Sequence, residues 1–280
     1  MDLAIGVENL LSQLEYSESK TGCLETGFKT FDKEYGGLVE GGITVIGGRI
    51  QMGLTDFCTS LINNVSIQNK IPSTYITLDS IEDDIRNRLI SSHLTINRYR
   101  LNRLDLKKKD VKKIKYSVPE IKKFPITIYD DVLPKPIALL NKIQEVIKDD
   151  KPKLFILDDL NQIESGDKSF NNFLDDIKNI ATKTNVSFVL SYHINNEVEK
   201  RGGDKRPLLF DLNPRYYLRK ISDMIIYIYR PEYYGLDEDV KGQSTKNLAE
   251  LLVRKSSSGK VGTVNLKYNR KYCSYKNIES

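Results

Sequence analysis

The stretch ITVIGGRIQMGLTDF, residues 43–57, decides the fold of this chain. It opens with a β-rich apolar run, residues 43–48, and leads into a helix-like segment that covers residues 56–68. A short loop that holds glycines joins the two. A strand that turns tightly into a helix is the first part of a β-α-β unit, so this stretch predicts an α/β protein.

The loop follows the phosphate-binding pattern G-x-x-x-x-G-K-[ST] at three of its four fixed positions. Gly48 and Gly53 occupy the glycine positions, and Thr55 supplies the hydroxyl that would hold Mg²⁺. In such a loop the backbone amides and the positive end of the helix dipole hold the phosphates. Leu54 replaces the lysine, whose charge-assisted contacts to the phosphates are worth about 1.5–3 kcal/mol each. We therefore expect only weak binding of ATP and Mg²⁺.

The alternation of strand and helix signals continues along the chain. Five further β-rich runs cover residues 73–79, 126–131, 153–159, 187–193 and 224–230. Helix-like segments over residues 137–148 and 170–182 lie between some of them. Continuous apolar strands separated by amphipathic helices predict a mainly parallel central sheet flanked by helices. Residues 249–255 and 262–268 read as a C-terminal β-hairpin at one edge of that sheet.

A second acidic signal follows the strand over residues 153–159. In KLFILDDLNQ, Asp158 comes directly after four apolar residues, and Asp159 follows it. A strand that ends in aspartate beside a phosphate loop is the arrangement that orients Mg²⁺ in nucleotide-hydrolysing proteins. Taken alone, the same sequence would also suit the acidic end of a strand in any α/β protein.

Composition excludes several classes of protein. The 280 residues include three cysteines, which are far apart, and two histidines, so neither a disulfide framework nor a structural metal site is expected. No stretch approaches eighteen uncharged apolar residues, and the first residues carry acids where a secretory signal would carry a basic region. We expect a cytoplasmic protein without a membrane partner.

The net charge of +5 is unevenly placed along the chain. Residues 98–123 hold eleven basic residues and three acidic ones. Such a cluster can attract phosphate backbones in a salt-dependent way. The alternative interpretation is a solvated helical face, which charge runs commonly form.

Five collinear segments resemble the motor domain of bacterial and phage replicative DNA helicases, the DnaB-like family. They are TGFKTFDKEYGGLVEGGITVIGGRIQMGLTDF, LDDLNQI, YHINNEVEKRGGDKRPLLFDL, ISDMIIYIYRPEYY and AELLVRKSSSGKVGTVNLKY. The family patterns at these places include TGF-x-x-LD-x-x-x-x-GL, R-P-S-M-G-K-T, I-D-Y-L-Q-L and K-Q-R-N-G. Arg49 and Met52 match the phosphate loop of the family, while its proline and lysine are missing here.

The resemblance implies a RecA-like P-loop fold over residues 21–280. It also implies a hexameric ring that binds ATP between neighbouring subunits and draws single-stranded DNA through its centre. Residues 1–20 carry one apolar helical stripe and fall where the family keeps a linker helix that docks on the adjacent subunit. A helix packed on its own domain would show the same spacing.

Several positions that carry catalysis in the family have changed. The glutamate that activates water falls on Asp79, whose side chain is shorter, and the arginine finger falls on Ser257, with Lys255 retained two residues earlier. Asp158 keeps the metal-orienting position, and Asn161 falls in the same motif, where the family places nucleotide-binding residues. An arginine finger is worth about 10³–10⁵ in turnover, so this resemblance predicts impaired hydrolysis.

The DNA-binding loop of the family, D-L-R-E-S-G-S, becomes DLNPRYY here. Its arginine is displaced, its glycine is a tyrosine, and a proline restricts the turn. The residues expected to contact single-stranded DNA are Lys200, Arg201, Lys205, Arg206, Arg215 and Tyr216. Arginine and lysine would contact phosphates, and the tyrosine either stacks on bases or packs under the loop.

Three hypotheses follow. The first is a helicase-family protein in DNA replication with weak or lost ATP hydrolysis, which forms a homo-oligomer or pairs with an active helicase subunit or a loader. The second is an active helicase in which Arg49 or Lys255 approaches the phosphates and one of Asp79, Glu82 or Asp83 holds the water. The third is a single-stranded nucleic-acid binding module that depends on the basic run at residues 98–123.

Overall fold

The computed structural model describes residues 22–164, 166–203, 205–213, 215–239 and 241–278. Strand β3 (Ile43–Gly48) lies in the middle of a nine-stranded sheet with the order β11-β10-β9-β8-β3-β7-β6-β4-β5. The predicted linker helix over residues 1–20 lies outside the described residues.

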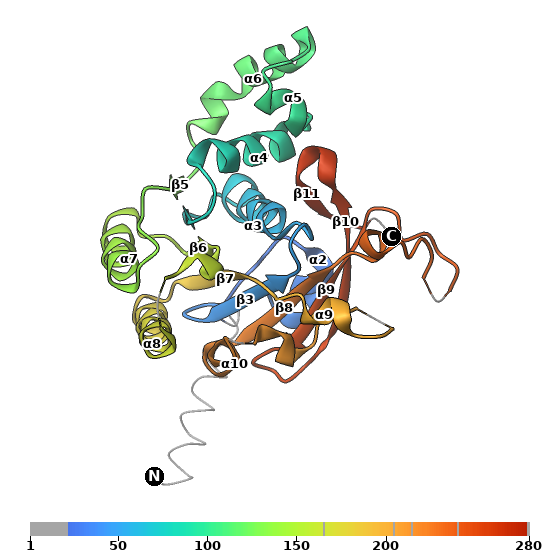
Figure 1. The fold of residues 1–280 in the computed structure, drawn as a ribbon. Helices are drawn as coiled ribbons and strands as arrows, with labels where there is room; N and C mark the ends of the chain where they lie inside the picture. Colours follow the sequence, from blue (N-terminus) through green and yellow to red (C-terminus); the bar gives the residue numbers. More distant parts are fainter. Residues whose placement is uncertain (1–21, 165, 204, 214, 240, 279–280) are drawn as a thin grey trace, which may run out of the picture.

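Six strands run parallel and form the larger part of the sheet (Figure 1). Besides β3 they are β5 (Ile126–Tyr129), β4 (Ser73–Thr77), β6 (Leu154–Asp158), β7 (Ser187–His193) and β8 (Met224–Tyr229). These are the six strands that the sequence predicts, and the observed strands begin or end within two residues of the expected bounds. The mainly parallel sheet is confirmed.

The C-terminal strands run antiparallel. Strands β9 (Leu248–Lys255) and β10 (Gly262–Asn269) form the predicted hairpin, and β9 pairs with β8. A further strand, β11 (Ser274–Asn277), pairs with β10 and forms the outer edge of the sheet. The sequence analysis missed β11, because SYKN is short and mostly polar. A separate two-stranded sheet joins β1 (Cys23–Leu24) to β2 (Leu38–Val39).

Helices cover both faces of the large sheet. One face packs against α2 (Lys29–Tyr35), α3 (Leu54–Ile62) and α4 (Glu82–Leu94), and the other against α7 (Pro136–Asp150), α8 (Asp167–Thr184) and α10 (Tyr217–Ile221). Strand β6 shows why: Leu154 and Ile156 enter the first core, and Phe155 and Leu157 enter the second. Alternate side chains of a strand point to opposite faces, so a continuous apolar run needs cover on both.

Helix α3 begins two residues earlier than predicted and continues as a π-helical turn, η1 (Asn63–Gln68). It begins at Leu54 because Gly53 has φ +90° and ψ +37°, a left-handed conformation that glycine adopts without a steric penalty. The shorter helical segments are α9 (Glu197–Lys200), η2 (Leu160–Gln162), η3 (Leu209–Leu212), η4 (Pro231–Tyr234) and η5 (Arg270–Tyr272).

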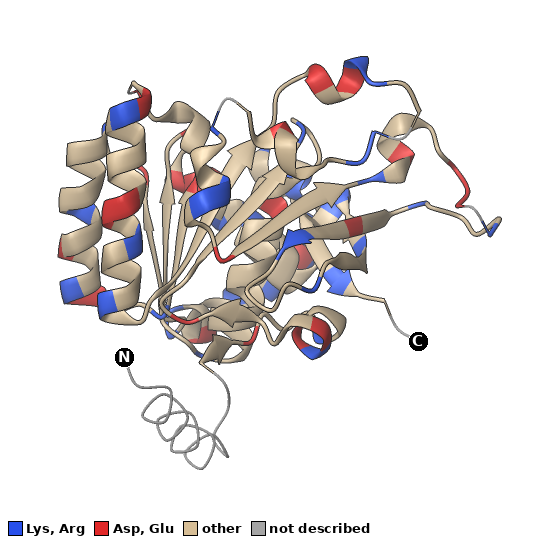
Figure 2. Cartoon of the chain, turned by 90° about the horizontal axis from the view of Figure 1, so that it is seen from below, with Lys and Arg blue, Asp and Glu red and all other residues tan. Residues whose placement is uncertain are grey.

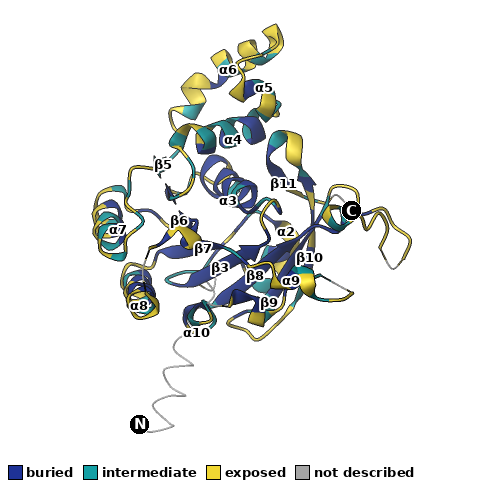
Figure 3. Cartoon of the chain, in the orientation of Figure 1, coloured by how far each residue is buried: buried dark blue, intermediate teal, exposed yellow. Residues whose placement is uncertain are grey.

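The basic run forms an arm that stands away from the sheet. Helices α5 (Arg98–Asn102) and α6 (Lys108–Ile121) extend beyond α4 in Figure 1, and most of their residues are exposed (Figure 3). By contrast, Figure 2, which views the chain from below, shows acidic and basic residues mixed along α7 and α8 at the left. The basic arm is therefore a distinct feature of the described surface.

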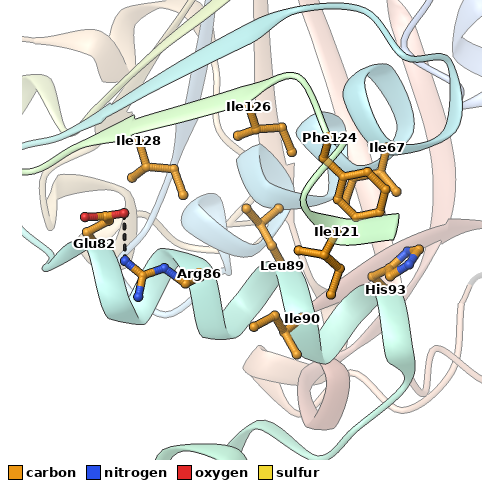
Figure 4. A pocket seen from close by; sticks show the side chains of 10 residues that line it. All are labelled: Ile67, Glu82, Arg86, Leu89, Ile90, His93, Ile121, Phe124, Ile126 and Ile128. Atoms are coloured by element: carbon orange, nitrogen blue, oxygen red, sulfur yellow. Dashed lines mark ion pairs between the residues drawn. The ribbon is translucent and has the colours of Figure 1, made fainter. Parts of the chain in front are cut away.

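An apolar pocket of about 240 Å³ lies between α4 and the edge strand β5 (Figure 4). Leu89 and Ile90 of α4 face Ile126 and Ile128 across it, and the ion pair of Glu82 with Arg86 lies at one end. Strands β7, β6 and β4 separate β5 from β3, so this pocket is remote from the phosphate loop. Among the described helices, none has the length and apolar character that crossing a membrane requires.

Candidate nucleotide-binding site

The carboxyl ends of the parallel strands meet at one edge of the sheet, where ligands of open α/β sheets bind. The loop between β3 and α3 lies at this edge, and Tyr275 of β11 packs against it. The hydroxyl of Tyr275 donates a hydrogen bond of 2.8 Å to the carbonyl of Met52. A Cβ atom on Gly53 would lie 2.7 Å from that hydroxyl oxygen, so the close contact requires glycine there.

Leu54, at the position of the missing lysine, turns into the core. It is 1 % exposed and belongs to the same apolar cluster as Ile228. A Cβ atom on Gly48 would lie 2.4 Å from Leu54 Cδ1, which shows how closely the leucine covers the start of the loop. The side chain therefore serves packing and brings no charge to the phosphate cradle. Met52, also 1 % exposed, is likewise a core residue.

Thr55 and Asp158 lie together as the sequence predicts. The Thr55 hydroxyl donates to Asp158 Oδ2 at 3.0 Å, the Tyr75 hydroxyl donates to the same oxygen at 2.6 Å, and the Ser191 hydroxyl donates to Oδ1. Mg²⁺ prefers such hard oxygen ligands, and a hydroxyl beside a strand-end carboxylate is the pair that holds it in P-loop proteins. Thr55 and Asp158 thus fit Mg²⁺, which would neutralise phosphate charge there. No group of three or more His, Cys, Asp or Glu among the described residues could hold a metal ion by itself.

Two residues that the sequence analysis left without a role lie beside Asp158. Asp159 is 2 % exposed, and burial raises the pKa of its carboxyl to about 6. His193 ends β7 opposite Gly48 of β3, and its Nε2 lies 3.8 Å from Asp159 Oδ2. Both residues end predicted strands, and this position in the sequence could have identified them as members of the site.

Asn161, expected to bind nucleotide, joins two strand ends instead of pointing freely into the site. Its amide nitrogen donates to the carbonyl of His193 at 2.9 Å, and its amide oxygen accepts from the His193 backbone N–H at 2.7 Å. Asp79 is exposed after β4 and accepts a hydrogen bond of 3.1 Å from Ser80. Partial burial of the carboxyl, and then the nearby charge of Asp158, raise the pKa of Asp79.

Arg49 within the loop and Arg230 beside it are already bound to protein groups. Arg49 donates from Nε to Glu199 Oε1 and from Nη1 to the carbonyl of Ile194, each at 2.9 Å, and it is 9 % exposed. Arg230 donates to the carbonyl of Gln51 at 3.3 Å and forms an ion pair with Glu232. Both guanidinium groups hold loop segments in place, and neither replaces the lysine in this conformation.

Lys255 and Ser257 lie at the other end of the sheet, where the parallel strands begin. Strand β9 runs antiparallel to β8, and Lys255 pairs with Ile225 near the start of β8, whereas the phosphate loop follows the end of β3. The Lys255 ammonium donates to the carbonyls of Arg219 at 2.7 Å and Ser222 at 2.5 Å, and burial lowers its pKa. Ser257 is exposed in the turn between β9 and β10. The sheet thus separates both residues from the phosphate loop of their own chain.

Most of the residues expected to contact DNA have acidic or backbone partners. Arg206 makes two hydrogen bonds, of 2.6 and 2.7 Å, with the carboxylate of Glu250. Arg201 forms an ion pair with Asp211 at 2.8 Å, and Arg215 forms one with Asp167 at 3.1 Å. Lys205 donates to the carbonyl of Glu199 at 2.8 Å. Lys200, in an ion pair with Glu197, and Tyr216 are exposed. Tyr217 bonds to Asp175 of α8 through its hydroxyl, so this second tyrosine of the loop packs on the helix.

A glycine-bearing loop between a central parallel strand and a helix, with a hydroxyl against a strand-end aspartate, defines a P-loop protein of the RecA-like class. The family profile described as DnaB-like helicase C terminal domain matches residues 23–277. The chain therefore belongs to the DnaB-like helicase C-terminal domain family.

Individual relatives are consistent with this family. The chain is 27 % identical over 276 residues to a probable replicative DNA helicase of Trieres chinensis, covering 95 % of this chain and 60 % of that protein. It is 26 % identical over 279 residues to the replicative DNA helicase DnaB of Haemophilus influenzae, covering 96 % and 58 %. The chain thus spans about three fifths of the length of these relatives.

Solved structures share the fold. One of them, described as an ATPase domain, superposes with a TM-score of 0.84 at 24 % identity, covering 99 % of each chain. A DnaB-like replicative helicase, solved in a study of its interactions with primase, gives a TM-score of 0.85 at 24 % identity, covering all of this chain and 67 % of that one. The RecA-like fold expected from the resemblance is confirmed.

Proposed function

We propose that this chain acts in DNA replication as a helicase-family protein whose own ATP hydrolysis is weak or lost. The observation that carries the proposal is the burial of Leu54 over Gly48, because it puts an apolar side chain where a lysine would hold the phosphates. Thr55 and Asp158 keep the geometry for Mg²⁺, so weak nucleotide binding is retained. The chain then works as a weakly nucleotide-binding scaffold on single-stranded DNA.

Three further contacts support loss of turnover. Arg49, the arginine within the loop, is bound by Glu199 and Ile194, which keeps it away from a phosphate-binding role. Asp79 stands where the family has a longer acid, and a displacement of about 1 Å at a reacting group can cost a hundredfold in rate. Ser257 stands where the family has an arginine, and serine has no charge to stabilise the transition state.

The position of Lys255 supports assembly with other subunits. Because Lys255 and Ser257 lie at the edge opposite the phosphate loop, they can reach a nucleotide only in the site of a neighbour. This favours a homo-oligomer, with six subunits in the ring that the family forms, or a mixed assembly with another helicase subunit or a loader. One of the solved relatives is described with its primase, and a replication partner of this kind fits the proposal.

Calorimetric titration with Mg-ATP, combined with mass determination with and without the nucleotide, tests the proposal directly. We expect weak binding and a change of assembly state, with DNA-stimulated turnover far below the range of about 1–100 s⁻¹ of phosphoryl-transfer enzymes. Turnover within that range would contradict the proposal and favour an active helicase with substituted residues. The pair of Asp159 and His193 is the observation that keeps this second candidate open, since it adds ionisable groups beside Asp158.

The basic arm supports the third candidate, a nucleic-acid binding module that acts without nucleotide. Most of its lysines are exposed on α6, away from the sheet. Binding through the arm predicts an affinity that falls steeply with salt, does not respond to ATP and weakens when Lys108, Lys109 and Lys112 are replaced by glutamine. Replacing Lys148, Lys168 and Lys183 on α7 and α8 by glutamine is the matched control. Unchanged salt dependence in the arm variant would exclude this function.

A further inference from the structure

Phe210 exposes its aromatic ring to solvent beside the segment that resembles the DNA-binding loop. Phe210 lies in η3 and is 51 % exposed. Burying a side chain of this size is worth about 1.5–3 kcal/mol, so exposing the ring forgoes part of that stabilisation.

Phe210 lines a hollow of about 370 Å³ between α9 and η3. Asn195, Arg201, Asp211 and Asn213 contribute to its other walls. The volume lies in the range of about 300–1,000 Å³ that small-molecule pockets have, so a planar ring system can enter it. Its lining residues follow β7 in the chain and reach into the altered DNA-binding loop.

The ring of Phe210 is held in place before any ligand arrives. The guanidinium of Arg201 lies 5.0 Å from the ring centroid, and Asp211 fixes that guanidinium with a hydrogen bond of 2.8 Å. The arginine covers part of the ring, and the exposed remainder lines the hollow. A pre-oriented aromatic ring beside a cation is the platform on which proteins stack the bases of single strands.

We propose that this hollow takes an unpaired base of single-stranded DNA, stacked on Phe210. The inference rests on the proposed function and states how the strand is held. Carboxylates already pair with three of the arginines expected to contact DNA, which weakens the binding of these arginines to phosphates. The pairs are Arg201 with Asp211, Arg206 with Glu250 and Arg215 with Asp167. Stacking supplies affinity without free cations, and every base offers a face for it.

The test compares two labelled oligonucleotides of the same length by fluorescence anisotropy, a poly-dT strand and a strand of abasic sites. They share the backbone charge and differ only in bases. Phe210→Ala is expected to weaken binding of the dT strand by about 5- to 150-fold, the range of one base-stacking contact, and to leave the abasic strand unchanged. Phe210→Trp should retain the preference for dT. Leu208→Ala, which removes a neighbouring exposed side chain outside the hollow, should change neither affinity.

The outcomes separate this inference from the proposed function. If the unmodified protein binds both strands equally, or Phe210→Ala weakens both equally, the stacking proposal is wrong and the hollow belongs to another ligand, such as a protein partner. If the unmodified protein binds neither strand with or without Mg-ATP, DNA binding itself is refuted. Thermal melting of Phe210→Ala should match that of Leu208→Ala, because neither side chain is buried.

Discussion

Leu54 and Gly48 are in direct contact at the start of the phosphate loop, where a Cβ atom on Gly48 would lie 2.4 Å from Leu54 Cδ1. In a loop of this pattern the residue at position 54 is a lysine that extends to the phosphates. Here the leucine turns back over the strand, and the glycine leaves room for it. The same glycine that admits phosphates in related loops thus admits an apolar side chain in this one.

Gly48→Ala is expected to destabilise the protein by about 1–3 kcal/mol, because its methyl group would overlap Leu54 in a closely packed core. Thermal or urea unfolding measures the change. The double variant Gly48→Ala with Leu54→Ala should lose less stability than the sum of the two single variants, since the smaller side chain relieves the overlap. Gly166→Ala, at a position with open space around its Cβ, is the control. A cost for Gly48→Ala no greater than that of the control would refute the contact.

Leu54→Lys is expected to tighten Mg-ATP binding by about 10- to 100-fold, the equivalent of one charge-assisted contact, and to leave turnover low. Calorimetry measures the affinity, and phosphate release in the presence of single-stranded DNA measures the turnover. Leu54→Met keeps the size and lacks the charge, so it should bind nucleotide as the unmodified protein does. Full turnover in Leu54→Lys alone would mean that the other substituted positions do not limit hydrolysis.

Adding Ser257→Arg to Leu54→Lys is expected to raise DNA-stimulated turnover at least about tenfold over Leu54→Lys, a modest part of the 10³–10⁵ that an arginine finger supplies. Because Ser257 lies at the sheet edge opposite its own phosphate loop, the gain should grow with protein concentration as subunits associate. Ser258→Arg, one residue further along the same exposed turn, is the matched control. A gain that is independent of concentration would argue against a site shared between subunits.

Tyr275→Phe is expected to lower the free energy of unfolding by about 1–3 kcal/mol, since it leaves the buried carbonyl of Met52 without its partner. The loop should also bind Mg-ATP more weakly, because β11 no longer holds its backbone. Tyr99→Phe, at an exposed position of α5, should have no effect on either measurement. Equal stability of the two variants would show that β11 does not support the loop.

Asp159 predicts a pH dependence of stability with a defined sign. Burial raises its pKa in the folded state from 3.8 to about 6, so the folded protein binds more protons than the unfolded chain between these values. This group therefore favours folding most at acidic pH, and its contribution is lost as the pH rises through about 6. Asp159→Asn removes the titration and should stabilise the protein above pH 7 by up to about 2–3 kcal/mol.

Urea unfolding between about pH 5 and pH 8 measures the difference between Asp159→Asn and the unmodified protein. The difference should shrink toward pH 5, where the carboxyl is mostly neutral in the folded state. Asp131→Asn, at an exposed position, is the control. A difference that stays constant across this range would contradict a raised pKa for Asp159.

The fold was largely predictable from the sequence, because strand and helix signals are local. The six parallel strands, the hairpin of β9 and β10 and the helices α3, α7 and α8 were each expected from short runs of residues. The structure also brings Thr55 and Asp158 into contact, since the carboxyl ends of parallel strands meet at the same end of the sheet. Strand β11 was missed because its four residues carry little signal until Tyr275 and Tyr268 pack against the loop.

The site required the tertiary structure, because its properties depend on partners far apart in the sequence. Arg49 meets Glu199, Arg206 meets Glu250 and Lys255 meets the end of α10, and no local pattern announces which charges neutralise one another. Likewise, the edge on which Lys255 lies follows from the antiparallel pairing of β9 with β8. The sequence by itself determined the strands, the phosphate loop and the family, since these depend on neighbouring residues. Only the folded chain decided that Leu54 turns into the core and that most of the expected DNA-contacting cations are paired, because long-range packing and charge pairing set both.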